Sequence, residues 1–179
     1  MIIRRMITVF AILIFVPSPF AQGSADEALV NSVFQRLLSA PTVTQPPNKY
    51  SSWPPDVSVI TAERDGVPVT QQNSMNAFSA APDCRPIVRI SQDLLTQVVQ
   101  GDPDRLAMIL GHELGHVVLG HPVCTSAKDT TSVVALAATL DQEYAADAKR
   151  YEFVLAAGFS VRNGLTAQQR CNRKVDLAG

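Results

Sequence analysis

All three histidines of the chain lie within ten positions, in the segment His112-Glu-Leu-Gly-His116-Val-Val-Leu-Gly-His121. His112 and His116 are four residues apart, which is about one turn of an α-helix. This spacing constrains the fold, because the two imidazoles point the same way only if the segment is helical. A helix that carries them can present both rings to one zinc ion.

Glu113 lies about 100° around such a helix from His112. Its carboxylate is therefore expected beside the metal rather than on it, where it can hold and deprotonate a zinc-bound water. The alternative is a helix whose histidines sit at a solvated end. A longer motif in which the third zinc ligand is also a histidine would place Gly at position 119 and that histidine at position 122. This chain has Leu119 and Pro122 there. We therefore interpret His121 as a helix-end residue.

A long helix predicted over residues 131–157 carries two carboxylates in the middle of one face. The residues of that face follow spacings of four and three and are apolar at both ends: Leu136, Leu140, Glu143, Asp147, Tyr151, Val154 and Gly158. Burying two carboxylates costs several kcal/mol unless something neutralises them. Zinc would do so, with Glu143 as third ligand and Asp147 accepting a hydrogen bond from a ligating histidine. The alternative is a half-exposed acidic face with Arg150 as salt-bridge partner.

The remaining pattern predicts an α+β fold with a small antiparallel sheet. A helix is expected over 25–40, a proline-rich connection over 41–55, a hairpin of strands 57–60 and 67–69, and a strand over 87–90. Helices are expected over 92–100 and 103–122. Asp102 supplies the N-cap of the second helix and Pro103 its first position, and Gly158 supplies a C-cap after the last helix.

Residues 1–23 predict a secretory signal peptide. Arg4 and Arg5 precede an apolar run over 7–16, and small residues follow that allow cleavage after Gly23 or Ala25. The alternative is an uncleaved membrane anchor, although the run is well short of the ~20 residues that a spanning helix needs. We therefore expect an exported protein, periplasmic or secreted, with weak membrane association only if the signal is retained.

Charge and cysteine content narrow the class of partner and the compartment. The net charge is −1 and no Lys/Arg run is present, which argues against nucleic acid as a partner. In an oxidising compartment, Cys84, Cys124 and Cys171 would give one disulfide and one remaining thiol, with three pairings possible. No two of these cysteines share a short ligand spacing, so they are not expected to bind metal.

The two histidines and the later carboxylates together resemble the gluzincin peptidases of the HtpX-like and CaaX-prenyl-protease family. That family's pattern is HExxH followed by E-x-x-A-D on a later helix, which here is Glu143-Tyr-Ala-Ala-Asp147. Upstream, Asn76-Ala-Phe78 resembles the element that precedes the family's edge strand, and Ile87–Ile90 resembles that strand. The resemblance covers about residues 57–160.

The resemblance implies a zincin-like zinc-dependent metalloendopeptidase with one zinc per chain, bound by His112, His116 and Glu143, with Glu113 as general base. It implies a peptide or unfolded-protein substrate that pairs with the edge strand formed by Ile87, Val88, Arg89 and Ile90. Residues 57–160 would form the peptidase domain, after an N-terminal helix and connection over 24–56 and before a polar tail over 161–179.

Two departures from the family leave a second function open. The chain has no transmembrane hairpin, so a soluble exported relative is expected. It also has no histidine after position 121, so Tyr151 or Arg150 would have to donate to the oxyanion, although plain packing or salt bridging explains them equally well. The alternative function is a catalytically weak peptide-binding or assembly module that retains zinc for stability.

Overall fold

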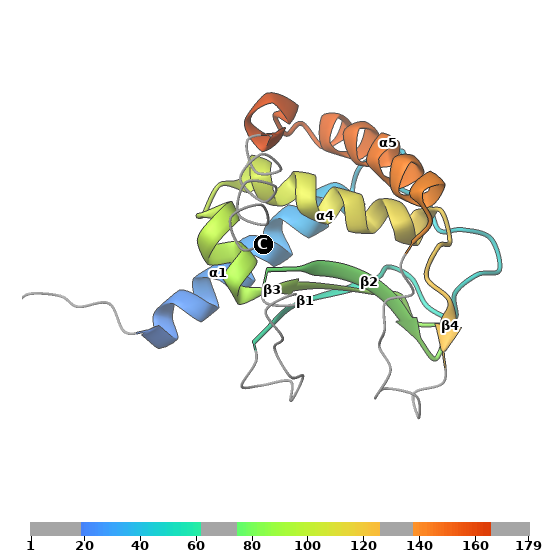
Figure 1. Ribbon diagram of the computed structural model, residues 1–179, viewed down its shortest axis with the longest axis horizontal. Helices are drawn as coiled ribbons and strands as arrows, with labels where there is room; N and C mark the ends of the chain where they lie inside the picture. The colour runs from blue at the N-terminus through green and yellow to red at the C-terminus, as the bar shows by residue number, and fades with distance from the viewer. Residues whose placement is uncertain (1–18, 62–74, 126–137, 166–179) are drawn as a thin grey trace, which may run out of the picture.

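The computed structural model describes residues 19–61, 75–125 and 138–165 (Figure 1). Its elements, in chain order, are α1 (Pro19–Leu38), β1 (Asp56–Ile60), β2 (Ala77–Pro82), β3 (Ile87–Ser91), α3 (Gln92–Leu94) continuing as the π-helical turn η1 (Leu95–Val99), α4 (Pro103–Val118), β4 (Cys124–Thr125) and α5 (Leu140–Ala156). The predicted α+β class is confirmed. Within the described residues, no helix is long and apolar enough to cross a membrane.

The four strands form one sheet in the order β1-β3-β2-β4. β3 is parallel to β1 and antiparallel to β2, and β2 pairs in parallel with β4 only at Ala81 and Pro82. The sheet is therefore mixed rather than antiparallel. The expected partner of β1 in a hairpin, residues 67–69, lies outside the described residues.

The prediction that Ile87–Ile90 is an edge strand is wrong, because β3 has a partner on each side. The cause is the strand β2, part of which was predicted only as an element preceding the edge strand. β2 has the sequence Ala-Phe-Ser-Ala-Ala-Pro and holds no β-branched residue, so the usual strand signal is absent.

The N-terminal helix α1 belongs to the same core as the sheet and α4. One face of α1 buries Val30, Val33, Phe34 and Leu37, which follow helical spacing. These residues pack in one cluster with Val88 and Ile90 of β3 and with Leu106 and Leu110 of α4. Figure 1 shows α1 and α4 on one side of the sheet, with α5 on the far side of α4. The boundary expected at residue 57 is therefore not a boundary of the core.

Helix α4 begins as predicted and ends earlier than predicted. Asp102 accepts hydrogen bonds from the N–H groups of Asp104 (2.9 Å) and Arg105 (3.3 Å). At the other end, Gly120 has a φ of +71° and its N–H donates to the carbonyl of Val117, while the N–H of His121 donates to the carbonyl of His116. This is a Schellman cap, so the helix stops at Val118 before Pro122 is reached.

Helix α5 begins at Leu140 instead of residue 131, because Thr139 and Gln142 form a capping box there. Residues 126–137, including Leu136, lie outside the described residues. The helix ends as expected before Gly158, which has a φ of +74°. Its buried residues are Ala146, Arg150, Phe153 and Val154, whereas Leu140 is 65% exposed. The predicted buried face with Leu140 at one end is therefore wrong, and the face that packs on α4 is rotated around the helix.

A disulfide joins Cys84, just after β2, to Cys124 in β4. It selects one of the three possible pairings. Cys171 lies outside the described residues.

Candidate metal centre

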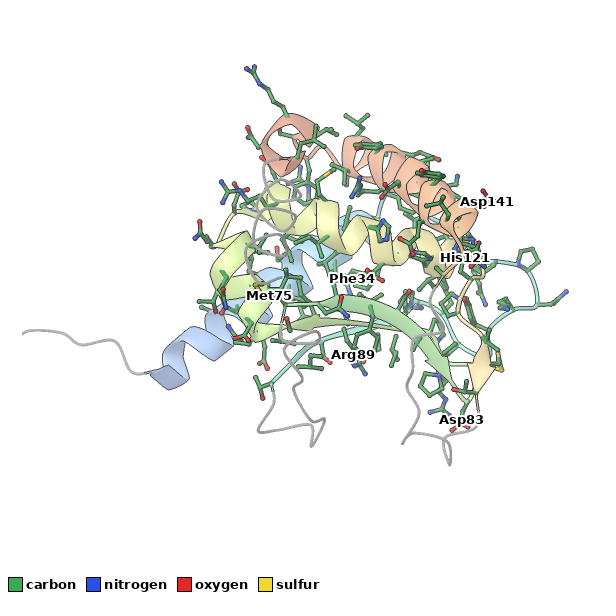
Figure 2. All side chains as sticks on the ribbon, in the orientation of Figure 1. Phe34, Met75, Asp83, Arg89, His121 and Asp141 are labelled. Carbon is green, nitrogen blue, oxygen red and sulfur yellow. A yellow bond between two sulfur atoms is a disulfide. The ribbon has the colours of Figure 1, made fainter. Side chains whose placement is uncertain are left out.

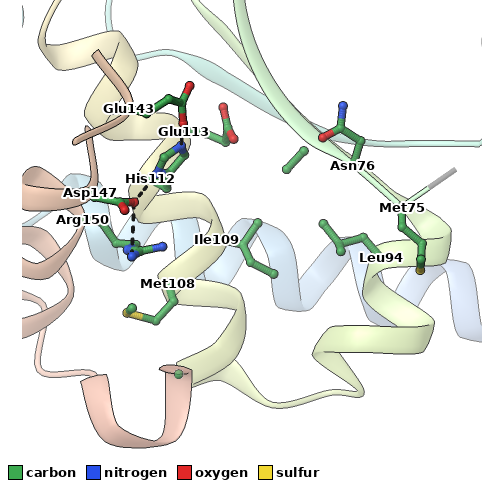
Figure 3. Close-up of a pocket in the computed structure, with 12 residues that line it drawn as sticks. Met75, Asn76, Leu94, Met108, Ile109, His112, Glu113, Glu143, Asp147 and Arg150 are labelled. Atoms are coloured by element: carbon green, nitrogen blue, oxygen red, sulfur yellow. Dashed lines mark hydrogen bonds and ion pairs between the residues drawn. The ribbon is translucent and has the colours of Figure 1, made fainter. Parts of the chain in front are cut away.

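Glycines on α4 allow α5 to cross it closely. A Cβ at Gly115 would lie 2.8 Å from the carbonyl oxygen of Ala146, and one at Gly111 would lie 3.3 Å from Val154. Only glycine at 115 lets the two backbones approach this closely. The crossing places the carboxylates at the beginning of α5 beside the histidines of α4 (Figure 3).

The three predicted ligands converge. The Nε2 atoms of His112 and His116 are 3.1 Å apart. Oε2 of Glu143 lies 3.2 Å from the first and Oε1 of Glu143 lies 3.5 Å from the second. In a tetrahedral zinc site with bonds of 2.0–2.1 Å, neighbouring ligand atoms are about 3.3–3.4 Å apart. The spacing of the three donors therefore fits one zinc ion.

Burial leaves His116 in the protonation state that a metal requires. His116 is 6% exposed. Its removal from water lowers the pKa of the imidazole from 6.5 to about 4, with smaller contributions from the neighbouring His112 and His121. The imidazole is then neutral at physiological pH and keeps a lone pair for a metal.

Asp147 contacts His112 as predicted. Its Oδ1 lies 2.8 Å from Nδ1 of His112, so the ring is oriented with Nε2 toward the other two donors. The same oxygen lies 3.2 Å from a guanidinium nitrogen of Arg150 (Figure 3). Arg150 also donates to the hydroxyl of Tyr151. The oxyanion roles of Arg150 and Tyr151 stay predictions.

Replacing Asp147 by asparagine is expected to weaken zinc binding about 10- to 100-fold. Asparagine keeps the size of the side chain, but it removes the charge that makes the imidazole of His112 more basic. A competition titration against a chromophoric chelator measures this affinity. Asp141→Asn, on an exposed position of the same helix, is the control. Native affinity in Asp147→Asn would mean that the contact does not support the metal.

Glu113 lies beside the ligand group and contacts Ser79 of β2. Burial raises the pKa of its carboxyl from 4.5 to about 7, and the negative charge of Glu143 adds to this. His112 and hydrogen bonds from the hydroxyl and N–H of Ser79 oppose the rise. A carboxyl with a pKa near neutrality can both accept and return a proton.

A cavity of about 280 Å³ adjoins the ligand group. One side is polar and carries His112, Glu113 and Glu143, and the other is apolar and is formed by Met75, Leu94, Met108 and Ile109 (Figure 3). This apolar side is not predictable from the sequence pattern, because its residues come from three separate segments.

The start of the expected polar tail contributes to the wall of this cavity through Gly164. Asp104 holds the segment, since its carboxylate accepts from the N–H of Ser160 and from the side-chain amide of Asn163, both at 2.9 Å. A Cβ at Gly164 would lie 2.8 Å from the carbonyl oxygen of Asp104 and would overlap the side chain of Met108, so only glycine fits there. The described part of the tail, residues 161–165, therefore packs against α4.

β2 presents an open edge next to the cavity. The N–H of Ser91 donates to the carbonyl of Asn76, and the antiparallel register places Phe78 opposite Arg89. In an antiparallel pair of strands, residues whose backbones hydrogen-bond to the partner strand alternate with residues whose backbones do not. The N–H and C=O groups of Ala77 and Ser79 therefore point away from β3. Among the described residues, β2 has a strand partner on that side only at Ala81 and Pro82. The edge strand beside the site is thus β2.

Comparison with known proteins assigns the family. The family model for peptidase family M48 matches residues 58–176, more than half of the chain, and the match includes α4 and α5 with all three converging donors. No curated protein and no solved structure matches the chain. The chain therefore belongs to peptidase family M48, a family of zinc-dependent metallopeptidases.

Proposed function

We propose that the protein is an exported zinc metalloendopeptidase that cuts peptide bonds in extended or unfolded segments. The observation that carries this proposal is the arrangement of four side chains. His112, His116 and Glu143 have the spacing of zinc ligands, and Glu113 lies beside them with a pKa raised to about 7.

Glu113 supplies the proton transfers. A zinc ion bound to the three donors would polarise the scissile carbonyl and make water a better nucleophile. Glu113, held by Ser79, accepts the proton of the attacking water and returns it to the amine nitrogen as the peptide C–N bond breaks.

The open edge of β2 binds the substrate. The outward N–H and C=O groups of Ala77 and the outward C=O group of Ser79 pair with an extended peptide by strand addition, while the N–H of Ser79 stays with Glu113. Asn76 and Ala77 also line the cavity, so a peptide on this edge passes the ligand group. The apolar side of the cavity then receives an apolar side chain of the peptide.

Export is supported by two independent features. The N-terminal sequence has the parts of a secretory signal, and the Cys84–Cys124 disulfide is typical of oxidising compartments. The protein would act in the periplasm or outside the cell.

Casein digestion by the purified mature protein tests the function. We expect cleavage that a chelator abolishes and that added zinc restores. Products mapped by mass spectrometry should place apolar residues next to the cleaved bonds. Casein that stays intact with zinc-loaded protein would contradict the proposal.

Ala77→Pro tests the substrate edge. Proline removes the outward N–H, and an edge strand tolerates it because no bond to β3 is lost. One lost hydrogen bond of about 0.5–1.5 kcal/mol predicts a roughly 2- to 10-fold fall in kcat/KM for a peptide substrate. Ala77→Gly keeps the N–H and is the matched control. Equal kcat/KM in the two variants would show that the substrate does not pair with this edge.

A further inference from the structure

We propose that His121 is a positioning residue for His116, which it orients by accepting a hydrogen bond from the Nδ1–H of that ring. The inference rests on the proposed function, since it concerns the zinc site. The Nδ1 atoms of the two rings are 2.9 Å apart, and the rings meet edge to face at 67°.

The direction of the hydrogen bond follows from the chemistry of the other ring nitrogen. Nε2 of His116 faces Nε2 of His112 and the carboxylate of Glu143. A metal there takes the Nε2 lone pair, so the ring proton of His116 stays on Nδ1. His116 therefore donates, and Nδ1 of His121 accepts. Because His116 is buried, its Nδ1–H requires such an acceptor.

The two histidine ligands thus have different supports. His112 is held by the carboxylate of Asp147, which comes from α5. His116 is held by a neutral acceptor that follows it along the chain by five residues. His121 lies on the Nδ1 side of His116, and it does not belong to the group of donors that converge on the metal.

The fold fixes His121 on both sides along the chain. Its N–H closes the Schellman cap of α4 on the carbonyl of His116, which needs the left-handed Gly120. Three residues later, Cys124 is tied to Cys84 by the disulfide and to β2 by strand pairing. Figure 2 shows His121 just past the end of α4. The ring is therefore built into the structure and not carried on an open loop.

Zinc affinity of position-121 variants tests the inference. His121→Phe keeps a ring and removes the acceptor, and we expect zinc affinity to fall about 10- to 100-fold, as when other partners of ligands are lost. His121→Asn places an amide oxygen near the position of Nδ1 and should retain an affinity close to the native value. Val123→Ala, at a 53% exposed position of the same segment, is the control. A chelator competition gives the affinities, and melting of the metal-free proteins shows that each is folded.

The outcomes separate this inference from the proposed function. Native affinity in folded His121→Phe, or equal losses in the Phe and Asn variants, would overturn the positioning role alone. If His121→Phe does not fold, His121→Ala removes the acceptor without filling the site and is read in the same way. A change in the coordination number of Co²⁺ in the Asn variant, read from the intensity of its visible bands, would make His121 a ligand and also overturn the proposal. A native protein that binds no zinc would overturn the proposed function itself.

Discussion

Replacing Glu113 by glutamine is expected to give a folded, zinc-loaded protein that hydrolyses peptides about 100- to 10,000-fold more slowly than the native protein. Glu113 is not one of the converging donors, so the metal should remain. Glutamine keeps the size and can still hydrogen-bond water and Ser79, but it cannot take up a proton.

The measurement is a pair of values for each protein, zinc per chain and kcat/KM for one peptide. Glu152→Gln is the control, because Glu152 lies on α5 and pairs with Lys149 outside the cavity. Native turnover in Glu113→Gln would remove Glu113 from the mechanism. Full function of this variant in cells, without hydrolysis, would favour a peptide-binding module.

The same variant has a pH-dependent effect on the metal-free protein. The pKa of Glu113 rises from 4.5 to about 7 on folding, so the folded state holds the proton that the unfolded state has lost. Ionising Glu113 therefore destabilises the fold increasingly from pH 4.5 to 7, and fully above that. Metal-free Glu113→Gln should be more stable than native protein at about pH 8 and equal to it below the unfolded pKa of 4.5. Denaturant unfolding at the two pH values measures the difference, and equal stability at the higher pH would contradict it.

Replacing His116 by alanine should remove zinc and activity together. His116 is the most buried of the three donors, and two remaining ligands cannot hold zinc against a chelator. The loss in affinity should exceed the roughly 10- to 100-fold effect of losing a ligand's partner. Elemental analysis after dialysis measures it, with Leu119→Ala at the exposed end of α4 as control. One zinc per chain in His116→Ala would place the metal elsewhere.

The helical half of the site was predictable because its determinants are local. The spacing of His112 and His116, the cap at Asp102 and the one-turn step from Glu143 to Asp147 are properties of single helices. Their meeting was not predictable from periodicity. It depends on the contact of Gly115 with Ala146, in a helix α5 whose Leu140 faces solvent.

The sheet half was predicted less well, because strand order is set by contacts distant in sequence. β3 was recognised from Ile87–Ile90, but its place in the sheet depends on β2, whose small residues resemble a loop. For the same reason, the open edge of β2 and the contact of Ser79 with Glu113 could not be predicted from the sequence. His121 carried one usable signal, since a glycine directly before it predicts a cap that turns the chain back onto the helix.

We propose that zinc held between α4 and α5 makes this protein a peptidase. Casein cleavage measured on one preparation at increasing zinc occupancy tests it most directly. We predict that the rate rises in proportion to bound zinc and reaches its maximum at one zinc per chain. Protein that carries one zinc per chain and leaves casein intact would contradict the claim.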